Sequence, residues 1–144
     1  MTENVLISIK GLQIGKDTSP ESIASQYEGR YFFRDGIQYL MYNEDYGNGE
    51  ETTKCLIKIG FNDVIVTKRG AVNVEIPFRV GTKKLVNYDT QFGGFTLGFK
   101  TKNISRSETN NCIQLHIDYV LDMNYEFMAD CHISIMVKEK EPVQ

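Results

Sequence analysis

Apolar side chains recur at every second position along most of the chain, which is the period of a β-strand with one buried face. The clearest segment is 113–121, where the odd-numbered residues are apolar or aromatic and residues 114, 116 and 118 are polar. The segment 127–137 repeats this pattern, again with its apolar residues at odd positions. Shorter segments with the same alternation are 5–9, 54–61 and 72–78. The pattern therefore predicts an all-β protein.

Turn-forming residues separate the predicted strands. Asp35-Gly36 lies between the segments 31–34 and 37–40, and a two-residue Asp-Gly link favours the type I′ turn of a β-hairpin. Gly70, Gly81 and the pair Gly93-Gly94 supply further breaks. We also expect a helical turn at 20–24 and longer loops at 46–51 and 105–111.

About ten short strands joined by short links describe an antiparallel meander. None of the predicted segments is a helix long enough to cover the apolar face of this sheet, so the sheet must cover itself as a barrel or a sandwich. A barrel also removes exposed sheet edges. We predict one domain over residues 1–144 that closes into a barrel of about eight to ten strands, with a frayed, charged tail at 138–144.

The apolar faces of the last two predicted strands constrain how those strands pair. Both faces are odd-numbered, so paired residue numbers must add up to an even sum, with 246, 248 and 250 as the candidates. A sum of 248 would pair His116 with His132 and Asp118 with Asp130, and these four side chains could then hold a transition metal. A sum of 246 or 250 separates the group into His–Asp pairs. Polar residues on the solvent face of a hairpin are the ordinary alternative.

Composition and charge remove several classes of function. The 144 residues include 16 Lys and Arg and 19 Asp and Glu, and this net charge of −3 does not suit a nucleic-acid binder. The N-terminal residues do not resemble a secretory signal, and no apolar run reaches the ~20 residues of a membrane helix. Three cysteines without a CxxC motif fit a reducing compartment, so we expect a cytoplasmic protein. We also expect no cofactor.

Sequence motifs for catalysis are missing. The chain has no GxGxxG, no GxxxxGK[ST] and no His-Glu-x-x-His, and both histidines fall on a predicted outer face. The 8 Tyr and 8 Phe are more informative, because a tyrosine combines a large apolar body with one polar hydroxyl. Such residues suit either a ligand cavity or the packed core of a small barrel. The candidates for lining a cavity are Tyr39, Tyr88, Phe92 and Tyr119, and Arg69 could lie at its mouth.

Several short motifs occur in a characteristic order along the chain. They are Val5-x-Ile7-x-Ile9-x-Gly11-x-Gln13, Gly29-x-Tyr31, Gly36-x-x-Tyr39-x-x-Tyr42, Thr53, Arg69-Gly70 and Tyr88-x-Thr90-x-Phe92-Gly93. In this order they resemble the YwiB-like family of bacterial domains of unknown function, although Phe92 stands where the family often has Tyr. The resemblance implies a calycin-type, lipocalin-like β-barrel, an architecture that often carries small apolar molecules. It adds Thr90 to the candidate ligand-binding residues and implies no catalytic residue.

Three hypotheses follow from the sequence. The first is a non-catalytic binding module with a small, partly apolar ligand inside the barrel, and it requires an interior that is not packed solid. The second is an interaction or scaffold protein that acts through its outer surface or as a homo-oligomer, with Leu56, Val120 and Met136 on the exposed face. The third is a metal-dependent enzyme built on the His116 group, which requires the register sum of 248.

Overall fold

The computed structural model describes residues 1–15, 19–45, 52–90 and 93–140. Ten strands follow one another in the described chain: β1 (Asn4–Gly15), β2 (Glu21–Arg34), β3 (Ile37–Glu44), β4 (Thr53–Ile59), β5 (Asp63–Arg69), β6 (Val74–Arg79), β7 (Lys83–Thr90), β8 (Gly93–Thr109), β9 (Cys112–Met123) and β10 (Glu126–Glu139). The described part of the chain contains no helix that is long and apolar enough to cross a membrane.

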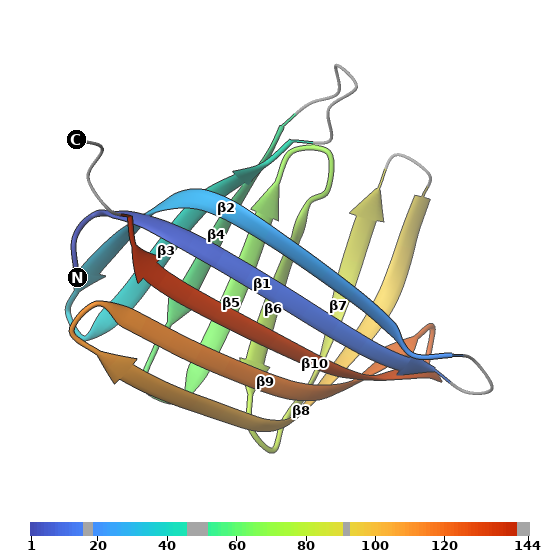
Figure 1. Ribbon diagram of the computed structural model, residues 1–144. Coiled ribbons are helices and arrows are strands. Elements are labelled where there is room, and N and C mark those ends of the chain that lie inside the picture. Colours follow the sequence, from blue (N-terminus) through green and yellow to red (C-terminus); the bar gives the residue numbers. More distant parts are fainter. Residues whose placement is uncertain (16–18, 46–51, 91–92, 141–144) are drawn as a thin grey trace.

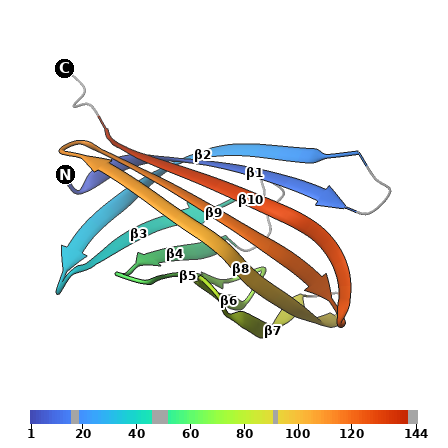
Figure 2. The ribbon, with the colours of Figure 1, turned by 90° about the horizontal axis from the view of Figure 1, so that it is seen from below.

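All ten strands belong to one antiparallel sheet in the order β6-β5-β4-β3-β2-β1-β10-β9-β8-β7 (Figure 1). The first strand pairs with the last, so the sheet curls into a barrel whose remaining gap lies between β6 and β7. Figure 2 shows the barrel from below as two layers, with β8, β9, β10, β1 and β2 crossing over β3 to β7. The predicted all-β, antiparallel barrel of about ten strands is therefore confirmed.

The alternation of the sequence places one side of each strand inside the barrel. In β9 the odd-numbered residues from Ile113 to Tyr119 are buried, whereas Gln114 is exposed and His116 is half-buried. The most tightly packed part of the core lies at the end of the barrel where β1 begins and β10 ends, and it includes Val5, Ile7, Leu40, Ile59, Val64, Ile113, Leu115 and Val137.

The β2–β3 hairpin has the predicted turn. Asp35 and Gly36 both have positive φ angles, 54° and 79°, and Arg34 pairs with Ile37 across the turn. Positive φ at both central residues is the requirement of a type I′ turn. The Asp-Gly prediction is thereby confirmed.

The β9–β10 hairpin pairs with the sum of 250, one of the three candidates, so the cluster of two histidines and two aspartates that a sum of 248 would give does not form. Its two turn residues, Asn124 and Tyr125, both have positive φ angles and bring Glu126 opposite Met123, an odd sum of 249. A β-bulge at Met128 inserts one residue and restores an even sum from Ala129 onward. The tight turn and the parity of the two apolar faces are reconciled by this single extra residue.

Three other local predictions are wrong in whole or in part. Residues 20–24 form no helical turn, because residues 21–24 lie in β2 and pair with β1. Residues 105–109 are not a loop but the end of β8. Their side chains are all exposed and show no apolar alternation, but their backbone still pairs with β9. The expected loop at 46–51 lies outside the described residues. At the C-terminus, Lys138 and Glu139 pair with β1 instead of belonging to a frayed tail.

The barrel is open at one end because β2 leaves β3 after a short pairing. Only Arg30 to Arg34 pair with β3, whereas residues 21–30 of β2 pair with β1. The strands separate at Gly29, where an added Cβ would lie 2.6 Å from Ile7 Cδ1 and 2.7 Å from the Met41 carbonyl oxygen. Glycine at this position lets β3 cross close to β1 and β2, and beyond it the two layers diverge.

Candidate functional site

The open end of the barrel leads into a cavity of about 420 Å³ between the two layers. Its walls are mostly apolar and aromatic, and all ten strands contribute residues to them. The residues that line it include Ile9, Tyr27, Tyr42, Ile57, Val66, Ile76, Phe78, Tyr88, Leu97, Phe99, Tyr119, Leu121 and Ile133. Phe78, Phe99 and Tyr119 contact one another at its inner end, with ring centroids 5.0 to 5.8 Å apart. The barrel interior is thus packed at one end and hollow at the other.

Two charged side chains also line this apolar cavity, Glu44 from β3 and Lys68 from β5. Both continue the inward-facing positions of their strands, after Tyr42 in β3 and after Val66 in β5. Lys68 Nζ lies 2.8 Å from Glu44 Oε1, and the two side chains are 26% and 15% exposed. The pair is therefore mostly withdrawn from water, at the level where the cavity opens.

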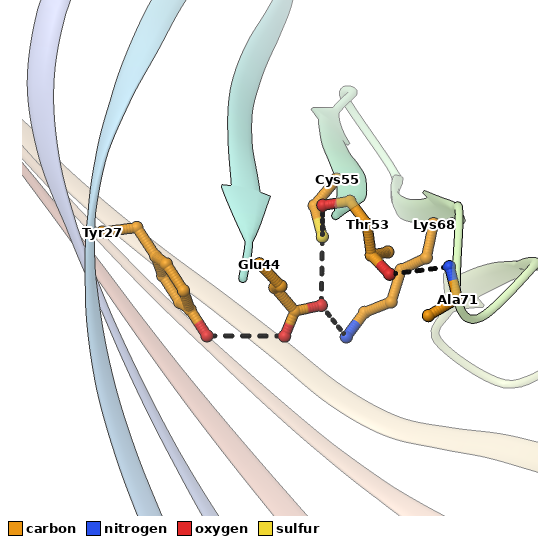
Figure 3. Close-up of polar contacts among 6 residues, drawn as sticks. All are labelled: Tyr27, Glu44, Thr53, Cys55, Lys68 and Ala71. Carbon is orange, nitrogen blue, oxygen red and sulfur yellow. Dashed lines mark hydrogen bonds and ion pairs between the residues drawn. The ribbon is translucent and has the colours of Figure 1, made fainter. Parts of the chain in front are cut away.

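Glu44 accepts hydrogen bonds from residues of three other strands, β2, β4 and β5 (Figure 3). Besides Lys68, the Cys55 thiol donates to Oε1 at 3.1 Å and the Tyr27 hydroxyl donates to Oε2 at 3.4 Å. Burial by itself would raise the pKa of Glu44, but the hydrogen bonds from Lys68, Cys55 and Tyr27 outweigh it and hold the pKa below its ordinary value. Glu44 is consequently a carboxylate at neutral pH.

The same carboxylate affects the groups around it. Burial, followed by the hydrogen bond to Glu44, raises the pKa of the Cys55 thiol to about 12. Burial also raises the pKa of Tyr42, whose ring lies 4.6 Å from that of Tyr27. At neutral pH these groups are uncharged donors beside one anion and one cation.

A turn next to this group is held in place by hydrogen bonds between side chains and backbone groups. The Ala71 amide donates to the buried Thr53 hydroxyl at 3.1 Å (Figure 3). At Gly70 the φ angle is +145°, and an added Cβ would lie 2.5 Å from the Thr52 carbonyl oxygen. Arg69, a predicted ligand-binding residue, is exposed and donates to the carbonyls of Lys68 and Val74. These contacts position the β5–β6 turn over β4.

The structure brings some of the predicted aromatic residues together. Tyr88 and Tyr119 line the cavity, and Tyr119 is 8% exposed. Tyr39 faces outward, where Lys58 lies over its ring with Nζ 5.8 Å from the centroid. Thr90 pairs with Gly93 through its backbone, and the Thr90 side chain, like all of Phe92, lies outside what the structure describes.

The histidine group lies on the outer face of β9 and β10 as a chain of contacts, and Asp118 pairs with His132 as a sum of 250 requires. Asp118 contacts His132 Nδ1, the Ser134 hydroxyl lies 3.1 Å from His132 Nε2, and His116 Nδ1 lies 3.0 Å from the same hydroxyl. The two imidazoles stack with their centroids 5.5 Å apart. Asp130 is paired with Val120 and Ile14 instead. No group of three or more metal-ligating side chains suited to a metal ion occurs within the described residues.

Sequence reasoning missed Glu44 and the three residues that donate to it, Tyr27, Cys55 and Lys68. A signal for two of them is present, because Glu44 and Lys68 occupy positions where the alternation of their strands requires an inward-facing residue. Glu44 pairs with Thr53 of β4, and Lys68 pairs with Cys55 of the same strand. Glu44 and Lys68 therefore lie close to one another on either side of β4. A charged residue at an inward position is the pattern that would have indicated them.

These features define a class: an antiparallel β-barrel whose apolar cavity opens beside a largely buried carboxylate–ammonium pair. The chain belongs to the family described as a domain of unknown function, DUF1934, whose model matches residues 7–135. The resemblance to YwiB-like domains is thereby confirmed.

A curated relative and a solved structure agree with this assignment. The chain is 30% identical over 91 residues to the uncharacterized beta-barrel protein YwiB of Bacillus subtilis (strain 168), and the match spans 63% of this chain and 63% of that protein's length. The crystal structure of ywiB protein from Bacillus subtilis matches with a TM-score of 0.79 and 22% identity, over 96% of this chain and 93% of that chain. At this identity the structural match shows a shared fold.

Proposed function

We propose that the protein is a non-catalytic binding module that holds a small, partly apolar ligand inside the barrel. The proposal includes a calycin-like mode of binding, in which the ligand enters at the open end, and a place in the bacterial cytoplasm. The analogy with calycin barrels is one of architecture and supplies only a starting expectation.

One observation carries the proposal, namely the cavity itself. Its volume of about 420 Å³ falls within the range of roughly 300 to 1,000 Å³ that is usual for small-molecule sites. Its lining is mainly apolar, with a few polar groups gathered near Glu44, and this combination is typical of sites that bury a ligand's body and orient one end of it. A barrel of this size could fill its interior with its own side chains, as many eight-stranded barrels do.

The binding of N-phenyl-1-naphthylamine, an apolar dye that fluoresces when it leaves water, tests the proposal. We expect saturable fluorescence with the wild-type protein and its loss in Val66→Trp, because Val66 lines the cavity and the larger side chain fills it. Thr67→Trp is the matched control, since the next residue of β5 faces outward. Equal dye binding by both variants, or no binding by the wild type, would refute the proposal.

A second candidate function is self-association through the outer face. Leu12 and Ile14 share the outward side of β1, where they are 37% and 45% exposed, and Met128 at the bulge of β10 is 43% exposed. The residues expected for such a surface, Leu56, Val120 and Met136, are half-buried. A homo-oligomer in sedimentation experiments that dissociates in Ile14→Asp supports this candidate, and a monomeric wild type at high concentration contradicts it.

A further inference from the structure

We propose that the ligand of this cavity carries one cationic head, such as the ammonium of a long-chain amine, on an otherwise apolar body. The inference rests on the proposed function and adds the chemical class of the ligand. It is argued from the unused capacity of the Glu44 carboxylate, from the charges that face the open end and from the aromatic rings beside them.

Glu44 has one well-bonded oxygen and one that is poorly used. Oε1 receives Lys68 at 2.8 Å and Cys55 at 3.1 Å. Among the described residues, Oε2 receives only the Tyr27 hydroxyl, at 3.4 Å, which is long for a bond between two oxygens. A carboxylate offers about four acceptor positions. An additional donor can therefore bind at Oε2 without displacing Lys68.

The charge of Glu44 favours a cation at Oε2. Glu44 and Lys68 both line the cavity, and Lys68 Nζ lies 2.8 Å from the other carboxylate oxygen, Oε1. A ligand carboxylate at Oε2 would meet a like charge, whereas an ammonium there would donate charge-assisted hydrogen bonds to Glu44.

The aromatic pair next to Glu44 adds a second attraction for a cation. Tyr27 and Tyr42 both line the cavity, and their rings lie 4.6 Å apart with a tilt of 31°. The face of a tyrosine ring attracts ammonium groups within about 6 Å. The apolar body of the same ligand would extend from this point towards Phe78 and Phe99 at the inner end.

Three ligands with the same twelve-carbon chain separate the head from the tail: dodecylamine, dodecanol and dodecanoate. Isothermal titration calorimetry at pH 7, below each micelle concentration, measures their affinities, and circular dichroism verifies that the protein stays folded. We expect dodecylamine to bind about tenfold more tightly than dodecanol, because charge-assisted hydrogen bonds are roughly twice as strong as neutral ones. Dodecanoate should be the weakest of the three, and added salt should reduce the preference for the amine.

Variants locate the preference on the protein. Glu44→Gln should bring the amine's affinity down to that of dodecanol while dodecanol binds as before. Tyr27→Phe removes the hydroxyl that donates to Oε2 and keeps the aromatic ring, so the preference for the amine should persist in it, which provides a test even if Glu44→Gln fails to fold. The matched control is Glu75→Gln, which removes the same charge from the exposed, outward side of β6 and should leave all three affinities unchanged.

The outcomes distinguish this inference from the proposed function. If dodecanol and dodecanoate bind as tightly as dodecylamine, the cavity is a ligand site but the inference is wrong. If the preference persists in Glu44→Gln, or is lost in Tyr27→Phe, the cationic head binds elsewhere and the inference is again overturned. If none of the three ligands binds, the proposed function fails with it.

Discussion

The Glu44–Lys68 pair allows a quantitative test of how the open end of the barrel is held together. Lys68→Met keeps an unbranched apolar stem and removes the ammonium. It leaves a carboxylate that is only 15% exposed with two neutral donors, Cys55 and Tyr27. Breaking a buried ion pair costs about 3 to 5 kcal/mol and losing an exposed one about 0.2 to 1 kcal/mol. Since Lys68 is 26% exposed, we expect a loss of about 2 kcal/mol in the free energy of unfolding.

A double-mutant cycle measured by urea unfolding separates the pair from other effects. Glu44→Gln alone should cost about 1.5 kcal/mol, and the double variant should cost about 2 kcal/mol, because the second change removes no further pairing. The resulting coupling energy is about 1.5 kcal/mol. Additive losses, or a loss below about 0.5 kcal/mol for Lys68→Met, would show that the pair is solvated like an ordinary surface pair and would refute the reasoning.

The pH dependence of the unfolding free energy tests whether the charge of Glu44 stabilises the fold. The folded-state pKa of Glu44 lies below its ordinary value, so its contribution to stability is present above about pH 4.3 and is lost as the pH falls through the folded-state pKa. Lys68→Met removes an interaction that lowers this pKa. The stability difference between wild type and Lys68→Met should therefore shrink below about pH 4. A difference that stays constant down to pH 2 would contradict the assignment.

Three further predictions concern the scaffold and its thiols. Gly29→Ala should lower the free energy of unfolding by about 1 to 3 kcal/mol, because the new Cβ meets the Met41 carbonyl, and chemical denaturation measures this loss. Gly36→Ala should cost about 1 kcal/mol in the same assay, while Gly36→Asn should cost less, because the φ angle of +79° suits asparagine better than alanine. At pH 8 a thiol reagent should modify the half-buried Cys112 well before Cys55, whose pKa burial raises to about 12, and faster labelling of Cys55 detected by mass spectrometry would contradict the buried site.

The sequence pattern predicts the strands well because each has one dry and one wet face. In β9 and β10 the odd-numbered apolar residues identify the buried side, and parity limits the register to three sums, one of which the hairpin adopts. The register sum of 250 depends on the β-bulge at Met128, and the alternation of apolar and polar residues does not indicate a bulge there. The end of β8 was missed for a related reason, since residues 105–109 are all exposed and only their backbone pairing with β9 makes them a strand.

The candidate site was less accessible to sequence reasoning. Aromatic content suggests a cavity wall, and Tyr88 and Tyr119 do line the cavity, but Tyr39 faces outward. In the alternation of β3, Tyr39 lies on the other face of the strand from the inward-facing Leu40 and Tyr42. Whether a barrel is hollow depends on how far its two layers diverge. Here that divergence follows from the early separation of β2 from β3, which is a long-range property of the sheet.

The most direct test of a ligand-binding interior is to locate a bound apolar molecule by nuclear magnetic resonance. In a sample with labelled isoleucine methyl groups, dodecanol at saturating concentration should show intermolecular contacts to Ile57 and Ile76, which line the cavity. It should show none to Ile14, which is 45% exposed on the outer face of β1. Contacts to Ile14 without contacts to Ile57 and Ile76, or no contacts to any isoleucine, would contradict the account.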